Sequence, residues 1–194
     1  MRTAEIARRT KETDITVKIN LDESCEAVVD TGIGFLDHML TAFARFAFIS
    51  LSVKCKGDLN VDGHHTAEDV GIAIGDALLS AIGGKEGIRR MGFARIAMDE
   101  ALAEATLDLS GRPFLVFRAM FTSPMIGDMD TQLFEEFFRA LASHSLMTLH
   151  LTVPYGSNSH HMAEAMFKAF GKALAEAVSY DERIKGVMST KGVL

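Results

Sequence analysis

Apolar and polar residues alternate in the first part of the chain and then take a helical spacing. Residues 15–21 alternate with period two, which predicts a half-buried strand, and residues 25–30 are expected to form a partner strand. Apolar positions then recur every three or four residues over 35–47, which predicts a helix with one buried face. Alternation returns over 49–55, and 64–82 is again helical by spacing until a glycine pair ends it.

The second half of the chain follows a similar order of elements. Residues 93–121 have the pattern of three strands, with a Gly-Arg-Pro turn at 111–113 between two of them. A short loop that contains Pro and Gly follows over 123–130. The closing segments are predicted as a helix, a strand and a helix, over 131–145, 147–153 and 160–178.

A repeat in the residues themselves accompanies this order. When Phe35–His38 is placed over Leu133–Glu136, the strands that follow coincide without a gap. The next helices then open with His64-His65-Thr66-Ala67-Glu68 and His160-His161-Met162-Ala163-Glu164. Helix–strand–helix is a common order, but a repeated His-His-x-x-Glu is not. We therefore interpret the chain as one domain, 1–194, duplicated internally into about 1–90 and 91–194, with two pseudo-equivalent sites.

Composition limits the class of protein. The 194 residues are 48% hydrophobic and 24% charged, which is typical of a compact soluble chain. The net charge of −6 argues against a broad basic surface for nucleic acid or anionic lipid, and no apolar run is long enough to span a bilayer. We see no secretory signal and only two cysteines, so we expect a cytoplasmic protein without a disulfide framework, and neither nucleic acid nor membrane as a partner.

Each His-His-x-x-Glu motif brings metal-binding groups to one side of a helix. The glutamate follows the two histidines by four and three positions, so Glu68 and Glu164 each lie within reach of both histidines of their motif. Neighbouring histidines diverge by about 100° around a helix, so we expect each pair to be divided between two metal ions. Imidazole with carboxylate favours Mn, Fe, Zn, Co or Ni over Mg or Ca.

Pseudo-symmetry adds two candidate ligands, because His38 and Glu136 occupy matching positions of the repeat. His144 and His150 have no such support and are interpreted as structural residues. The motif also differs from the His-Glu-x-x-His of zinc proteases, in which the glutamate between the ligands is the base. Scattered basic residues could together cradle a phosphate, but the sequence alone does not bring them together.

These motifs resemble the imidazoleglycerol-phosphate dehydratase family. The resemblance runs from Arg9 to the C-terminus, and it implies an α/β (α+β) fold of duplicated half-units with a helical layer sandwiched between two β-sheets. It also implies two Mn²⁺ per active site, sites built between subunits, and a homo-oligomer of 24 chains assembled from trimers. The segments that carry it are Gly32–Leu40, the two His-His-x-x-Glu motifs, Asp108–Pro113, Ser157–His161 and Ser189–Gly192.

The resemblance further implies a lyase of histidine biosynthesis that converts D-erythro-imidazoleglycerol phosphate, a phosphorylated imidazole, to imidazoleacetol phosphate. Two metals on the ring nitrogens would hold the imidazole as imidazolate, which expels the adjacent hydroxyl before a C–H proton is lost. Glu12 and Asp99 match acidic groups near the reacting chain, and Glu12 is the candidate for proton transfer. The implied metal ligands are His38, His64, His65, Glu68, Glu136, His160, His161 and Glu164. The implied phosphate-binding residues are Arg90, Arg112, Lys168, Ser189 and Lys191.

Four positions depart from the family pattern. Glu136 stands where many relatives have a histidine ligand, Ala42 replaces a glutamine, Phe46 a histidine and Gly63 an aspartate. Two other functions stay open. A binuclear metallohydrolase that acts on a phosphate ester would also need two ions and basic residues. A non-catalytic paralogue that keeps metal-dependent assembly is favoured by Ala42, Phe46 and Glu136. Product analysis separates the hydrolase, because it releases inorganic phosphate and a dehydratase does not.

Overall fold

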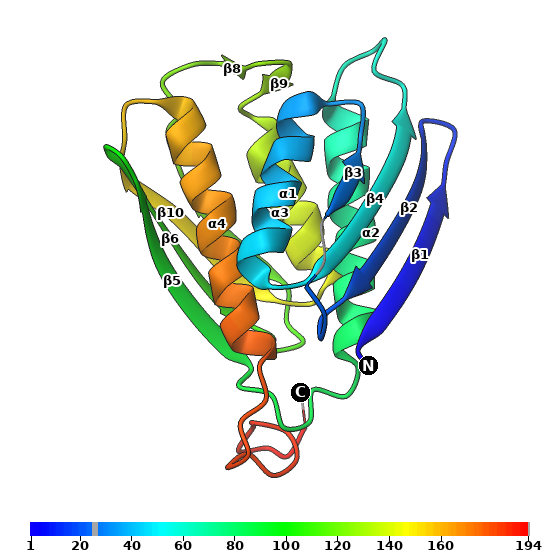
Figure 1. Ribbon diagram of the computed structural model, residues 1–194, viewed down its shortest axis with the longest axis vertical. Coiled ribbons are helices and arrows are strands. Elements are labelled where there is room, and N and C mark those ends of the chain that lie inside the picture. Colours follow the sequence, from blue (N-terminus) through cyan, green and yellow to red (C-terminus); the bar gives the residue numbers. More distant parts are fainter. Residues whose placement is uncertain (25–26, 194) are drawn as a thin grey trace.

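Two four-stranded sheets enclose four helices in the computed structural model, which describes residues 1–24 and 27–193 (Figure 1). This arrangement confirms the predicted helical layer between two sheets. The helices are α1 (Gly34–Ala47), α2 (His64–Ile82), α3 (Leu133–His144) and α4 (Ser159–Val178). The first sheet has the order β1 (Thr3–Arg9), β2 (Thr13–Asn20), β4 (Ser50–Gly57) and β3 (Val28–Asp30). The second has the order β5 (Met91–Met98), β6 (Ala101–Asp108), β10 (Thr148–Tyr155) and β7 (Phe114–Arg118).

The two sheets have the same strand order and the same directions. In each, three strands are antiparallel neighbours and the last, β3 or β7, lies parallel beside β4 or β10. The strand predicted over 25–30 is therefore not a partner of the strand at 15–21, because β1 and β4 already occupy both edges of β2. It pairs with β4 instead, and residues 25–26 of that prediction lie outside the described residues.

Strand β1 was not expected from the sequence. Its inward positions include Arg8, whose Nη1 lies 2.6 Å from Asp69 Oδ2 on α2. A charged residue at an inward position hides the alternation that would mark a strand, and the ion pair with Asp69 offsets part of the cost of placing it there. The two-residue strands β8 (Met125–Ile126) and β9 (Met129–Asp130) likewise lie inside the predicted loop.

The helices pack across the two halves of the chain. Helix α1 packs against α4, and α2 packs against α3. A Cβ at Gly75 would lie 2.7 Å from the carbonyl oxygen of Leu141, and a Cβ at Gly171 would lie 2.7 Å from that of Phe43. Both helix pairs therefore approach closely at a glycine, and at matching positions of the two halves.

The C-terminal segment, residues 179–193, folds back onto the connection between the halves. Gly87 N–H donates to the Gly186 carbonyl, and Asp181 N–H donates to the Gly87 carbonyl. In Figure 1 this segment lies at the bottom, at the end of the molecule away from the β8–β9 hairpin. Within the described part of the chain, no helix has the length and apolar character needed to cross a membrane.

Candidate active site

His38, His160 and Glu164 bring three candidate ligand atoms into one cluster. Glu164 Oε2 lies 3.2 Å from His38 Nε2 on α1 and 3.1 Å from His160 Nε2, one turn earlier on α4. Adjacent ligands of an ion bound at about 2.1 Å are roughly 3 Å apart, so this spacing fits one divalent transition metal. The imidazoles are half-exposed while Glu164 is buried, so the cluster is open on one side.

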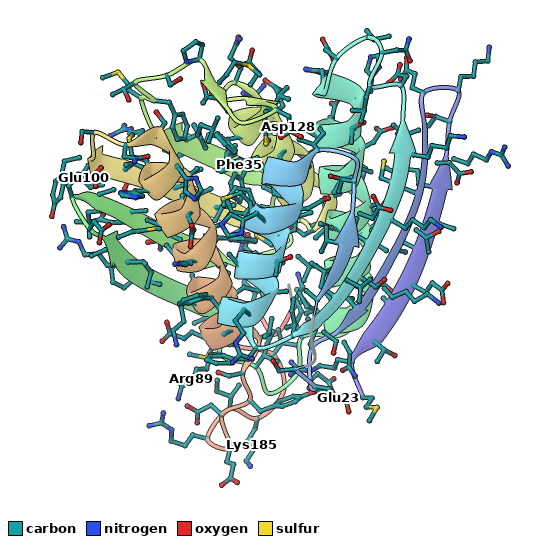
Figure 2. The ribbon with its side chains drawn as sticks, turned by 45° about the horizontal axis from the view of Figure 1, so that its top comes forward. Glu23, Phe35, Arg89, Glu100, Asp128 and Lys185 are labelled. Atoms are coloured by element: carbon teal, nitrogen blue, oxygen red, sulfur yellow. The ribbon has the colours of Figure 1, made fainter. Side chains whose placement is uncertain are left out.

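Local capping positions both helices of this cluster. Asn158 is the N-cap of α4, and its side chain accepts hydrogen bonds from the backbone N–H groups of His160 and His161. Helix α1 has no side-chain cap of its own; Asp128, in the β8–β9 turn, accepts from the N–H groups of Gly34 and Phe35. Figure 2 shows Asp128 beside Phe35 at the start of α1. The β8–β9 turn therefore fixes the helix that carries His38.

Glu164 is held as a carboxylate. Burial raises its pKa, but hydrogen bonds from Lys168, His38 and His160 outweigh burial and leave the pKa below its ordinary value. Lys168 Nζ lies 2.6 Å from Glu164 Oε1 and 5.3 Å from the centroid of the Phe46 ring. In the single chain, Lys168 thus contacts the metal-ligand cluster and not the other predicted phosphate-binding residues.

Three further predicted ligands lie on α2 and α3 and are gathered less tightly: His64, Glu68 and Glu136. His64 Nε2 lies 3.7 Å from Glu68 Oε2, and His64 and Glu136 line one cavity of about 610 Å³. The Glu136 carboxylate is drawn to Arg139, whose Nη1 lies 3.3 Å away. Among the described residues, only the His38 group therefore has its ligand atoms gathered within 4.8 Å of one another.

The second histidine of each motif points away from the first. The rings of His64 and His65 are 6.1 Å apart at 85°, and those of His160 and His161 are 6.3 Å apart at 83°. This divergence agrees with the expectation that one motif does not present both imidazoles to the same ion.

Each second histidine lies between two carboxylates, in the same arrangement in both halves. His65 Nδ1 is 3.0 Å from Asp58, and its Nε2 is 3.7 Å from Glu12 in the β1–β2 turn. His161 Nδ1 is 2.8 Å from Glu100, and its Nε2 is 3.8 Å from Asp99 in the β5–β6 turn. Both predicted acidic residues, Glu12 and Asp99, thus lie beside an Nε2 atom.

Asp58 and Glu100 were not identified from the sequence as residues of the site. Their hydrogen bonds raise the pKa values of His65 and His161, and they favour the tautomer with hydrogen on Nδ1, which leaves Nε2 free to bind a metal. The pKa of Glu100 is lowered to about 2 because it accepts from His161 and from the backbone N–H groups after β10. A carboxylate beside a ligand histidine is common in metal sites. Acidic residues in the predicted turns were therefore the only sign in the sequence that could have pointed to Asp58 and Glu100.

Four of the five predicted phosphate-binding residues share a cavity of about 1130 Å³. It lies where β5 begins and the C-terminal segment folds back, and Arg90, Arg112, Ser189 and Lys191 line it. Arg89, Arg183 and Lys185 add to its positive charge, against one lining carboxylate, Asp181. The cavity is therefore strongly basic and suits a dianionic phosphate.

The basic cavity and the predicted metal ligands lie at opposite ends of the folded molecule. Figure 2 places Arg89 and Lys185 at the bottom of the molecule, far from Phe35 and Asp128 at the start of α1. A substrate that has both an imidazole and a phosphate cannot reach both ends of a single chain.

Comparisons with known proteins agree with these features. A family model described as imidazoleglycerol-phosphate dehydratase matches residues 31–174. The imidazoleglycerol-phosphate dehydratase of Streptococcus sanguinis is 56% identical over all 194 residues of both chains. That of Acetivibrio thermocellus is 55% identical over 98% of this chain and 97% of its own. This chain belongs to the imidazoleglycerol-phosphate dehydratase family.

Solved structures of the family share the fold. The dehydratase of Staphylococcus aureus has a TM-score of 0.84 at 39% identity, covering 92% of this chain and 99% of its own. That of Pyrococcus furiosus, in complex with (S)-C348, has a TM-score of 0.84 at 36% identity, covering 97% and 100%. The family consists of hydro-lyases of histidine biosynthesis, and the predicted family and fold class are therefore confirmed.

For three of the four residues that depart from the dehydratase pattern, the structure shows contacts that fit the residue present. Glu136 binds Arg139, and the Phe46 ring covers the ammonium group of Lys168. Gly63 precedes α2, and a Cβ there would lie 3.1 Å from Ile33 and from Leu133. Nothing in the structure explains Ala42.

Proposed function

We propose that this chain dehydrates D-erythro-imidazoleglycerol phosphate to imidazoleacetol phosphate in the cytoplasm, with two Mn²⁺ per active site. The observation that carries this proposal is the cluster of His38, His160 and Glu164, whose ligand atoms have the spacing of a metal site in a chain of this family. The basic cavity adds a place for the phosphate of the substrate.

We assign the ligands to two ions. His38, His160 and Glu164 would hold the first, because they already form a cluster. Glu136 with His64 and Glu68 of α2 would hold the second, once Glu136 moves from Arg139 to the ion. An imidazole and carboxylate set of this kind suits Mn²⁺ and other divalent transition metals.

We further propose that His65 and His161 complete these ion sites in neighbouring copies of the chain. Their Nε2 atoms face the turns that hold Glu12 and Asp99, away from the first histidine of each motif. A substrate could then reach a basic cavity and a metal cluster that no single chain brings together. A homo-oligomer of 24 chains built from trimers is the assembly that we propose for this purpose.

The chemistry requires that a C–H proton be removed from a carbon with no adjacent carbonyl group. When bound, the two ions would supply Lewis acids at the imidazole ring and so stabilise negative charge on it. The residues of the chain would then do the rest. Glu12 and Asp99, beside the two Nε2 atoms, would accept and return the proton, and Arg112, Lys191 and Ser189 would fix the phosphate.

A product assay tests this function. Chelator-stripped protein is incubated with imidazoleglycerol phosphate, with and without Mn²⁺, and imidazoleacetol phosphate and inorganic phosphate are followed together. We expect the keto product only with metal, and no inorganic phosphate. Release of inorganic phosphate would indicate the metallohydrolase instead, and no product from metal-loaded protein would indicate the non-catalytic paralogue.

A matched pair of histidine variants makes the assay specific. His38→Asn removes a proposed ligand that contacts Glu164 across two helices. His144→Asn removes a histidine whose Nδ1 lies 2.9 Å from Asp76 across the other helix pair. We expect turnover to be lost in H38N and kept in H144N; equal loss in both would contradict the assignment.

A further inference from the structure

Arg90 is held on three sides by the protein itself. Its Nε and Nη2 donate to the two carboxylate oxygens of Asp108 at 2.6 and 2.8 Å, and its Nη1 donates to the carbonyl of Met188 at 2.7 Å. The guanidinium has five N–H groups, so two remain for a ligand. The side chain is only 12% exposed, yet it lines the basic cavity.

Asp108 is a rigid support for this arginine. It is the last residue of β6, and it pairs with Met91 on one side and with Thr148 on the other. The backbone of Asp108 is therefore fixed inside a sheet. An arginine side chain without such a support loses much rotamer entropy when it binds an anion. A side-on carboxylate pair fixes both the position and the plane of the guanidinium before the anion arrives.

The first half of the chain contains a similar clamp without the cavity. Arg2 precedes β1 as Arg90 precedes β5, and its Nε and Nη2 donate to Asp22 at 2.9 and 2.6 Å. Its Nη1 donates to the carbonyl of Val178, at the end of α4. The Tyr180 ring covers Arg2 at 4.4 Å, and Arg2 is not among the residues that line the basic cavity. The Arg2 clamp thus offers a control for the Arg90 clamp.

We propose that Asp108 is a positioning residue for phosphate binding, because it aims the two free N–H groups of Arg90 into the basic cavity. It does not touch the substrate and acts through Arg90. This inference rests on the proposed function, since it takes the cavity as the site of the substrate's phosphate. It also explains why a carboxylate is kept so close to a site for an anion.

Four variants of the metal-loaded enzyme test the inference: Asp108→Asn, Arg90→Ala, the double variant, and Asp22→Asn as control. The readouts are KM and kcat for imidazoleglycerol phosphate, and the inhibition constant of inorganic phosphate as a competitor. We expect D108N to raise KM and the inhibition constant about tenfold, as loss of an orienting partner does in other sites, while kcat changes less than about twofold. D22N is expected to leave both constants unchanged.

The double variant separates positioning from a general structural role. If Asp108 acts through Arg90, adding D108N to R90A raises KM no further. A further increase in the double variant, or wild-type constants in D108N beside raised constants in R90A, would overturn the positioning role while the proposed function stands. Wild-type constants in R90A would instead remove Arg90 from the phosphate site.

A conservative variant keeps the test decisive if D108N does not assemble. Asp108→Glu retains the charge but moves it outward by one methylene group. We expect KM to lie between those of the wild type and R90A. A wild-type KM and inhibition constant in D108E would overturn the claim that the placement of this carboxylate matters.

Discussion

Glu164 Oε2 on α4 lies 3.2 Å from His38 Nε2 on α1, although the two residues are 126 positions apart in the chain. The contact exists because each half of the chain packs its first helix against the last helix of the other half. Neither motif therefore has its ligands assembled by local sequence alone.

The first prediction concerns this carboxylate. Glu164→Gln keeps the shape of the side chain but removes the charge, so we expect metal content to fall from two Mn²⁺ per chain to one. The measurement is metal analysis after dialysis, with Glu135→Gln, a half-exposed glutamate on α3 that is not a proposed ligand, as control. Two ions per chain in E164Q would contradict the proposed ligand set.

The second prediction concerns the close approach of α1 and α4. A Cβ at Gly171 would lie 2.7 Å from the Phe43 carbonyl oxygen and 3.0 Å from the Ala47 nitrogen, so Gly171→Ala must force the helices apart. We expect a loss of about 2–3 kcal/mol in the free energy of unfolding and weaker Mn²⁺ binding. Denaturant titration and metal titration measure these effects.

Gly84→Ala is the control for that change. The nearest atom to a Cβ at Gly84 is 3.9 Å away, so the substitution meets no clash and is expected to leave both quantities nearly unchanged. Equal stability of G171A and G84A would show that the helix contact tolerates a larger residue.

The third prediction concerns metal removal and pH. Hydrogen bonds that His65 and His161 donate to Asp58 and Glu100 raise the pKa values of these imidazoles, so in the metal-free protein they hold a proton at a higher pH than usual. Metal binding needs neutral imidazole, so affinity is expected to fall as the pH drops through these raised pKa values. Titration of Mn²⁺ at a series of pH values measures this dependence.

Loss of the ions is also expected to loosen the proposed 24-chain assembly toward trimers. Light scattering before and after chelation measures the size, with metal analysis to show that the ions have left. If the metal-free protein keeps its size, the assembly does not depend on the ions and the prediction is wrong.

The fourth prediction concerns Cys55 on β4. Burial raises the pKa of this thiol from its ordinary value to about 11. Because the folded protein holds the proton more tightly than the unfolded chain, Cys55 stabilises the fold fully below pH 9 and loses that contribution as the pH rises toward 11. In a Cys25→Ser background, urea titration should show a steeper alkaline loss of stability with Cys55 than with Cys55→Ala. Parallel curves would contradict it.

Helix positions were accessible from the sequence because helical spacing is a local property. The helix predicted over 64–82 has the observed bounds, and its repeat mate α4 starts one residue before the prediction. The two histidines of each His-His-x-x-Glu motif point in different directions, as the rotation of about 100° per helical residue requires. Local spacing and the repeat therefore pointed to His38, His160 and Glu164, which the structure gathers into one cluster, and the other five ligands stay predictions.

Features that depend on contacts between distant segments were not accessible. The pairing of β3 with β4 depends on which strand edges are free, and β1 is hidden by Arg8, whose partner Asp69 is on another element. Asp58 and Glu100 have no motif of their own, since only the fold brings them to a histidine. The same is true of Asp108.

The exchange of helix partners between the halves also has a consequence for folding. When ribosomes have made only residues 1–90, α1 and α2 exist without α4 and α3, so the apolar faces meant for those helices stay exposed. The native core then forms only after the last helix is synthesised, from contacts of high sequence separation, which makes folding slow. We expect refolding to be a single late transition, with the first half prone to self-association until the second is complete.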